Sequence, residues 1–136
     1  MSTTENHMDM IEVVCGVIFD LDKVLVCRRK PGIILGGYWE FPGGKVEPNE
    51  RMEDTLTREL MEELAMKVEV ISHFKTNEHD YDGTLIRLIS FRCRYISSEL
   101  RMTDHDKLLW IHPGELAELE FAPADVPIVN EIVKYG

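Results

Sequence analysis

The chain has 136 residues, of which 44% are hydrophobic and 29% charged, and its formal net charge is -10. This size and composition are typical of one globular domain. The acidic balance argues against a nucleic-acid polymer as partner, because contact with a phosphate backbone needs a basic face. The apolar runs are too short to cross a bilayer, and the first ten residues lack the apolar segment of a signal peptide. We therefore expect a cytoplasmic protein without a membrane partner, whose three widely spaced cysteines are buried and reduced.

In the first half of the chain we expect a mobile leader and then a domain over residues 11–136. A β-rich run, a short polar turn and a second run predict a hairpin, and a loop rich in glycine and proline follows it. Asn49 is a plausible N-cap for the helix that comes next, with acidic residues in its first turn. The expected elements are a leader over 1–10, strands over 11–19, 24–29 and 39–41, and a helix over 49–64.

The second half of the chain predicts three more strands, a single helical turn and a terminal helix. The strand over 84–96 has apolar residues on both faces, as a central strand would. The other elements are strands over 68–74 and 107–111, a polar turn over 77–83, a helical turn over 113–116, and a helix over 123–135 with Val126, Val129, Ile132 and Val133 on its apolar side. Mixed strands with one central and one terminal helix predict a single α/β sandwich.

The central helix carries three carboxylates near its C-terminal end. Glu59, Glu62 and Glu63 span an arc of roughly 100° beside an apolar stripe, where the helix dipole disfavours negative charge. One interpretation is a solvated acidic face on which Arg58 pairs with Glu62 one turn away. The other is a site for hard divalent cations, whose preference for oxygen ligands would turn the repulsion into attraction.

The upstream sequence decides between these interpretations. The segment "GGKVEPNERMEDTLTRELMEELAM" resembles the Nudix box at seven positions: Gly44, Glu50, Arg58, Glu59, Leu60, Glu62 and Glu63. Ala65 and Met66 depart from it, since the family has glycine and then an aliphatic residue there. The stretch "YWEFPGGKVE" is similar to the MutT-like branch of small nucleoside triphosphate pyrophosphohydrolases. The resemblance implies the Nudix α/β/α sandwich, with a mixed β-sheet, one central catalytic helix and one C-terminal helix.

The resemblance also implies a set of roles. Glu59, Glu62 and Glu63 would ligate Mg²⁺ or Mn²⁺ together with a carbonyl of Gly43 or Gly44, and Glu50 and Arg58 would orient these acids. The expected reaction converts a nucleoside triphosphate and water to the monophosphate and pyrophosphate, mainly by positioning and electrostatics. The general base is either a glutamate of the box or an acid on a late loop, for which Asp106 is the candidate.

Further candidates concern the substrate. Arg28 or Arg29 could contact phosphate, with a surface arginine pair as the alternative. Trp39, Phe41 and Tyr81 could wall the base, with core packing as the alternative. Asp125 stands where a MutT-type enzyme carries a base-reading asparagine, and its alternative role is to cap the final helix. An ionised aspartate only accepts hydrogen bonds and favours a base edge rich in donors, whereas a protonated one could read other edges.

Three functions follow from this reading. The leading one is the removal of oxidised or noncanonical nucleotides such as 8-oxo-dGTP. The second is hydrolysis of CTP or 5-methyl-dCTP, since such enzymes share "WEFPGGK" and the aspartate of "PAD". The third is a Nudix-like module that binds a nucleotide without cleaving it. We expect a small nucleotide as the partner of a monomer or small homo-oligomer.

Overall fold

The computed structural model describes residues 9–135, and its centre is one mixed β-sheet. The strands are β1 (Asp9–Asp20), β2 (Lys23–Arg29), β3 (Trp39–Glu40), β4 (Gly43–Lys45), β5 (Met66–Tyr81), β6 (Thr84–Ser98) and β7 (His105–Ile111). The order β3-β2-β1-β6-β5 forms the main path, while β4 pairs with β1 and β7 with β2. The β1–β6 pair is parallel and the other named pairs are antiparallel. The predicted leader lies outside the described residues except for Asp9 and Met10, which begin β1.

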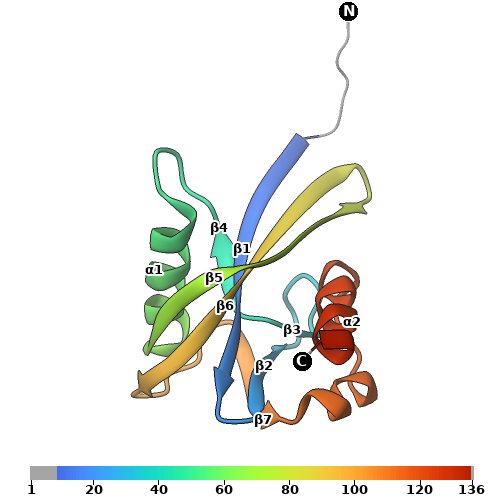
Figure 1. Ribbon diagram of the computed structural model, residues 1–136. Coiled ribbons are helices and arrows are strands. Elements are labelled where there is room, and N and C mark those ends of the chain that lie inside the picture. Colours follow the sequence, from blue (N-terminus) through green and yellow to red (C-terminus); the bar gives the residue numbers. More distant parts are fainter. Residues whose placement is uncertain (1–8, 136) are drawn as a thin grey trace, which may run out of the picture.

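Helices cover both faces of this sheet (Figure 1). They are α1 (Met52–Leu64), the 3₁₀ helices η1 (Pro113–Glu118) and η2 (Pro123–Asp125), and α2 (Val126–Tyr135). Figure 1 shows α1, in green, and α2, in red, on opposite sides of the strands. The predicted α/β/α sandwich is therefore confirmed. Within residues 9–135, no helix combines the length and apolar character needed to span a bilayer.

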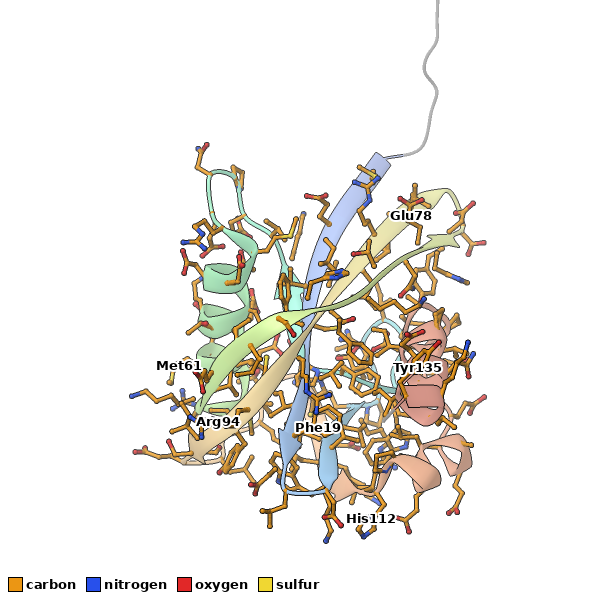
Figure 2. All side chains as sticks on the ribbon, in the orientation of Figure 1. Phe19, Met61, Glu78, Arg94, His112 and Tyr135 are labelled. Atoms are coloured by element: carbon orange, nitrogen blue, oxygen red, sulfur yellow. The ribbon has the colours of Figure 1, made fainter. Side chains whose placement is uncertain are left out.

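Two apolar clusters hold the layers together. Leu56, Leu60 and Leu64 of α1 are fully buried against one face of the sheet, as the i, i+4 spacing predicts. Ile128 and Ile132 of α2 are buried in the cluster on the opposite face. Met61, on the outer side of α1, is 44% exposed (Figure 2). The alternation of β1 and β2 side chains between the two clusters fixes which face of the sheet each helix covers.

The structure corrects the predicted boundaries of the central helix. It begins at Met52, not Asn49, and its N-cap is Arg51. Asn49 has a φ of 66° in the turn before the helix, whereas an N-cap needs an extended backbone. Asparagine tolerates this left-handed conformation better than most residues, which explains its place in the turn.

The prediction of a polar turn over residues 77–83 is wrong, because β5 continues to Tyr81, which pairs with Thr84 of β6. Only Asp82 and Gly83 form the turn, and both have positive φ angles. Asp-Gly is the dipeptide that a two-residue hairpin turn favours. The polar residues before it belong to a long hairpin whose side chains are largely solvent-accessible, so their polarity reflected exposure.

Other elements differ less. The strand β4 was not predicted, because its two glycines give no strand signal. Val126 and Val133, predicted on the apolar side of the last helix, are 41% and 54% exposed, and Ile128 is buried in their place. The three cysteines are free and buried, as expected.

Ala65, which replaces the glycine of the Nudix box, ends α1 in the left-handed conformation, with a φ of 51°. Its backbone N–H donates to the carbonyls of Leu60 and Met61, as in a glycine-terminated helix. An alanine is strained there by its Cβ.

We predict that Ala65→Gly stabilises the protein by about 1 kcal/mol, because glycine adopts this conformation without the Cβ penalty. Urea denaturation would measure the change. Ala65→Val, which adds a β-branched side chain at the same position, should destabilise, and an unchanged midpoint for both variants would contradict the cap assignment.

Candidate active site

The acidic end of α1 lies against the glycine strand β4. A Cβ atom added to Gly44 would collide with the carboxyl group of Glu59, and one added to Gly43 would collide with the carbonyl oxygen of Val14. Glycine is required at Gly43 because the obstacle is the backbone of β1, whereas at Gly44 a Cβ would push the Glu59 side chain away from the strand. This contact brings the backbone of β4 beside the carboxylates, as the box resemblance implies.

Arg58 connects the carboxylates of the box. Its Nε and Nη2 atoms donate to the two oxygens of Glu50, each at 2.9 Å, in a bidentate pair. Its Nη1 atom donates to Glu59 and Glu62, each at 3.1 Å. The pairing with Arg58, together with a hydrogen bond from Thr55 at 2.8 Å, lowers the pKa of Glu50 to about 2. Glu50 is therefore a fixed anion that orients Arg58.

Glu63 is in a different environment from its neighbours. Burial, and next to it the charge of Glu59 and a hydrogen bond with it, raises the pKa of Glu63 from 4.5 to about 9. Glu63 thus keeps a proton at neutral pH, because two close carboxyl groups cannot both ionise readily. Glu62 is more open, with 58% of its side chain exposed.

A cavity of about 690 Å³ opens beside Glu63. Its walls come from β1, β3, β4, the loop before β3, the tip of the β5–β6 hairpin and η2. The lining residues with chemical or aromatic side chains include Arg29, Glu40, Phe41, Glu63, Tyr81 and Asp125. Glu63 is the one carboxylate of the α1 trio among the lining residues, and it shares the cavity with Phe41, Tyr81 and Asp125, whereas Glu59 and Glu62 are not lining residues.

Asp125 lies in this cavity with little contact with solvent, since it is 6% exposed. Its Oδ2 atom accepts a hydrogen bond of 2.9 Å from the backbone N–H of Phe41. Burial, followed by the charge of Glu40, raises the pKa of Asp125 well above its usual range. The carboxyl group binds the segment after β3 and makes no described bond to the N-terminus of α2, so the alternative role as helix cap is not what residues 9–135 show.

The aromatic candidates have mixed positions. Tyr81 lines the cavity, and its hydroxyl accepts the backbone N–H of Ala124 at 2.9 Å. Asn77 donates to the carbonyl of the same residue at 2.9 Å, so β5 holds the segment that carries Asp125. Phe41 is at once a lining residue and a core residue, stacked on Phe121 with ring centroids 5.4 Å apart.

Arg28, Asp106 and Trp39 are not among the residues that line the cavity. Arg28 and Asp106 instead form a bidentate pair, at 2.9 and 2.7 Å, which lowers the pKa of Asp106. Trp39 is 8% exposed in the core under α2. Of the two adjacent arginines, Arg29 is the one that reaches the cavity, where it donates to the Ile34 carbonyl at 2.7 Å.

Sequence reasoning missed Glu40 and His105. Glu40 lines the cavity, and its Oε2 atom lies 2.8 Å from Nε2 of His105 and 3.3 Å from Nη1 of Arg29. The only local signal was a charged residue inside "WEF", between two apolar neighbours. The pairing with His105 joins residues 65 positions apart and has no signal in the sequence.

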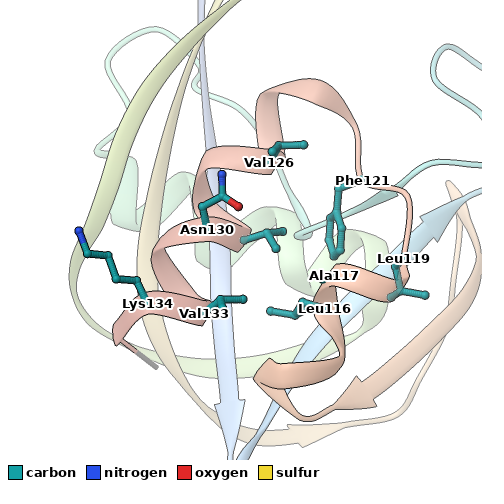
Figure 3. Close-up of a pocket in the computed structure, with 9 residues that line it drawn as sticks. Leu116, Ala117, Leu119, Phe121, Val126, Asn130, Val133 and Lys134 are labelled. Carbon is teal, nitrogen blue, oxygen red and sulfur yellow. The ribbon is translucent and has the colours of Figure 1, made fainter.

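A second hollow, of about 360 Å³, lies between η1 and α2 (Figure 3). Leu116, Phe121, Val126 and Val133 line it, and Asn130 and Lys134 are its polar residues. It contains no carboxylate, so it lacks the oxygen ligands for a divalent metal ion. The cavity beside Glu63 is therefore the candidate active site.

The carboxylates suit a hard cation, although the described residues do not form a closed cluster for one. Within residues 9–135, no three side chains of the metal-ligating types converge as a ready site, because Arg58 engages Glu59 and Glu62. The donors are nevertheless all oxygens, as Mg²⁺ and Ca²⁺ prefer. The raised pKa of Glu63 reflects in part its repulsion by Glu59, which a bound cation would relieve. The residues thus fit a divalent cation.

Comparisons with known proteins agree with this geometry. A NUDIX domain family model matches residues 13–131. The CTP pyrophosphohydrolase of Escherichia coli (strain K12) is 35% identical over 90% of this chain and 91% of its own. A putative 8-oxo-dGTP diphosphatase 2 of Mycobacterium tuberculosis (strain ATCC 25618 / H37Rv) is 36% identical over 83% of this chain and 81% of its own.

Among solved structures, the MutT protein of methicillin-resistant Staphylococcus aureus 252, a Nudix hydrolase, superposes with a TM-score of 0.76. It is 39% identical and covers 95% of this chain and 99% of its own. The chain belongs to the Nudix hydrolase family, as the box motif predicted. Members of this family generally use divalent metal ions.

We predict that Glu63→Gln stabilises the protein at neutral and alkaline pH in the presence of a chelator. The pKa of Glu63 is raised from 4.5 to about 9 in the folded state, so the folded protein binds more protons than the unfolded chain between these values. The free energy of unfolding therefore falls as pH rises from about 4.5 to about 9. Glutamine does not titrate, so the variant does not undergo this decrease.

Urea denaturation from pH 4 to pH 9.5, in the wild-type protein and the variant, would test this prediction. The advantage of the variant should be absent near pH 4 and should grow toward pH 9. A constant difference across the range would show that the Glu63 carboxyl group titrates normally.

Proposed function

We propose that this protein hydrolyses nucleoside triphosphates to nucleoside monophosphates and pyrophosphate, with Mg²⁺ or Mn²⁺ as the cation. The observation that carries the proposal is the shared cavity, which is lined both by Glu63 of the box and by Asp125. The relatives support the reaction class, because their names are those of a pyrophosphohydrolase and a diphosphatase. The presence of every acid of the box supports an enzyme over a module that only binds nucleotides.

In this proposal, Glu59, Glu62 and Glu63 hold the cation with a backbone carbonyl of Gly43 or Gly44. The bound cation supplies neutralisation of phosphate charge and a lowered pKa for an attacking water. Arg58 holds Glu59 and Glu62 in place, and the bidentate bond from Glu50 fixes Arg58. Such positioning carries most of the catalysis in phosphoryl chemistry, since little covalent work is asked of the protein.

Arg29 is the better candidate for a phosphate contact, because it lines the cavity while Arg28 is paired with Asp106. The pairing of Arg28 with Asp106 also argues against Asp106 as the general base. The lowered pKa of Asp106 makes it a weaker base than a carboxylate in the cavity would be. We therefore assign the base to a glutamate of the box and give Asp106 the role of a partner of Arg28.

The base of the substrate would lie against Phe41, Tyr81 and Asp125. Because burial raises the pKa of Asp125, its carboxyl group can keep a proton and then donate as well as accept. Such a group can read the carbonyl of 8-oxoguanine or the amine of cytosine. Our first candidates are oxidised nucleotides such as 8-oxo-dGTP, and the second is CTP, which the 35% identity to a CTP pyrophosphohydrolase favours.

We predict that Glu62→Gln lowers kcat by about 100-fold or more, as loss of one charge that stabilises the transition state typically does. The fold should be intact, because 58% of this side chain is exposed. Pyrophosphate release in the presence of Mg²⁺, together with circular dichroism, would measure both effects. Glu53→Gln makes the same chemical change in the first turn of α1 and serves as the control. Near-normal turnover in Glu62→Gln would refute the metal-site assignment.

We predict that Asp125→Asn changes which base is preferred while metal-dependent turnover remains. The amide oxygen of asparagine would keep the bond from the Phe41 N–H, which leaves an NH₂ group that only donates. Bases that present an amine there should lose most, so kcat/KM for CTP should fall about tenfold relative to that for 8-oxo-dGTP.

Asp22→Asn, in the turn between β1 and β2, is the matched control because its side chain is 75% exposed. An equal loss for both nucleotides in Asp125→Asn would mean that Asp125 only supports the fold. Detection of both products, the monophosphate and pyrophosphate, tests the reaction itself.

A further inference from the structure

Glu40 lines the same cavity as Glu63 and Asp125. Burial is the main cause of the raised pKa of both Glu63 and Asp125, and the charge of Glu40 adds to it in each case. The side chain of Glu40 is 18% exposed. This carboxylate has no proposed role in cation binding or in base recognition.

Both polar neighbours of Glu40 bind the same oxygen atom. Nε2 of His105 lies 2.8 Å and Nη1 of Arg29 lies 3.3 Å from Oε2. Among the hydrogen bonds of residues 9–135, none reaches Oε1. The carboxylate is thus held at one oxygen and has a second oxygen available to a group that enters the cavity.

The burial of His105 defines which nitrogen carries the proton. Its side chain is 1% exposed, and Nδ1 is buried without a partner in the described part of the chain. A proton on Nδ1 would leave a buried donor unsatisfied and would place a lone pair of Nε2 against a carboxylate. A proton on Nε2 avoids both costs, so His105 donates to Oε2 of Glu40, at a shorter distance than Arg29 does.

We propose that His105 is a positioning residue that fixes the carboxylate of Glu40 so that Oε1 accepts a hydrogen bond from an amino group of the substrate base. This inference rests on the proposed hydrolysis of nucleoside triphosphates and adds the substrate class, namely bases with an exocyclic amine. A fixed acceptor in a largely buried site favours a base that fills it, because a base without the donor leaves the acceptor unpaired.

The test compares nucleotides that differ in one amine, dGTP with dITP and dCTP with dUTP. In the wild-type protein, kcat/KM should be higher for the nucleotide with the amine. Glu40→Gln, of nearly the same shape, and His105→Gln should each lower this ratio by about tenfold or more. His73→Gln makes the same change at a histidine of β5 that is exposed and bonded to Thr76, and it should leave the ratio unchanged.

The double variant separates positioning from a structural role. If His105 acts through Glu40, His105→Gln should not lower the ratio further in the Glu40→Gln protein, whereas independent effects would multiply. Loss of activity toward both nucleotides of a pair, with the ratio intact, would overturn the inference. If His105→Gln fails to fold by circular dichroism, Glu40→Gln alone decides, and an unchanged ratio refutes the role of Oε1.

The outcome is also distinct from failure of the proposed function. If the wild-type protein releases no pyrophosphate from any nucleotide, the proposed function is refuted. The two nucleotides are then compared by calorimetric titration with dGMP and dIMP, and the Kd should be lower for dGMP. Equal Kd values would overturn the inference about Glu40 and His105 independently of catalysis.

Discussion

The arrangement of the carboxylates at the acidic end of α1 depends on the hydrogen bonds that the guanidinium group of Arg58 donates to them. This group joins Glu50, Glu59 and Glu62 within hydrogen-bond distance in a chain whose formal net charge is -10. Glu63 is balanced differently, by a proton that burial and Glu59 favour. The permanent charge of Arg58 and the exchangeable proton on Glu63 thus offset the repulsion among the carboxylates of the helix. Loss of the proton from Glu63 would allow a cation to bind, while the hydrogen bonds of Arg58 to Glu50 and Glu59 remain.

The sheet connects the carboxylates of α1 to the residues that we propose to read the base. β1 is the shared element, because it pairs with the glycine strand β4 and, on its other edge, with β6. The β5–β6 hairpin then reaches the segment before α2, where Asn77 and Tyr81 bind both polar backbone groups of Ala124. Asp125 is therefore positioned by a hairpin remote in sequence, while the carboxylates of α1 are positioned by their own helix. Substrate preference and metal affinity can consequently change separately.

Local patterns predicted the features whose cause is local. The i, i+4 stripe of α1 and the Nudix box both follow from spacing within one segment. The two strands of the β5–β6 hairpin were predicted, but the turn was drawn too long because exposed polar residues of a strand resemble a turn. The partner of Asp106 could not be predicted, since it arises from the pairing of β2 with β7, which includes a register shift at Arg28 and Arg29. The partners of Glu40 depend in addition on the pairing of β2 with β3. Long-range register of this kind is not written in any one segment.

The parallel pairing of β1 with β6 has a consequence for the order of folding. These strands are far apart in the chain, and most of the sheet lies between them in sequence. Closing such a long loop is entropically costly, so contacts of this kind form late compared with helices and hairpins. The β1–β2 hairpin and α1 can form early, whereas the wall with Tyr81 and Asp125 requires the late closure. A nascent chain would therefore acquire its acidic helix well before it could distinguish one base from another.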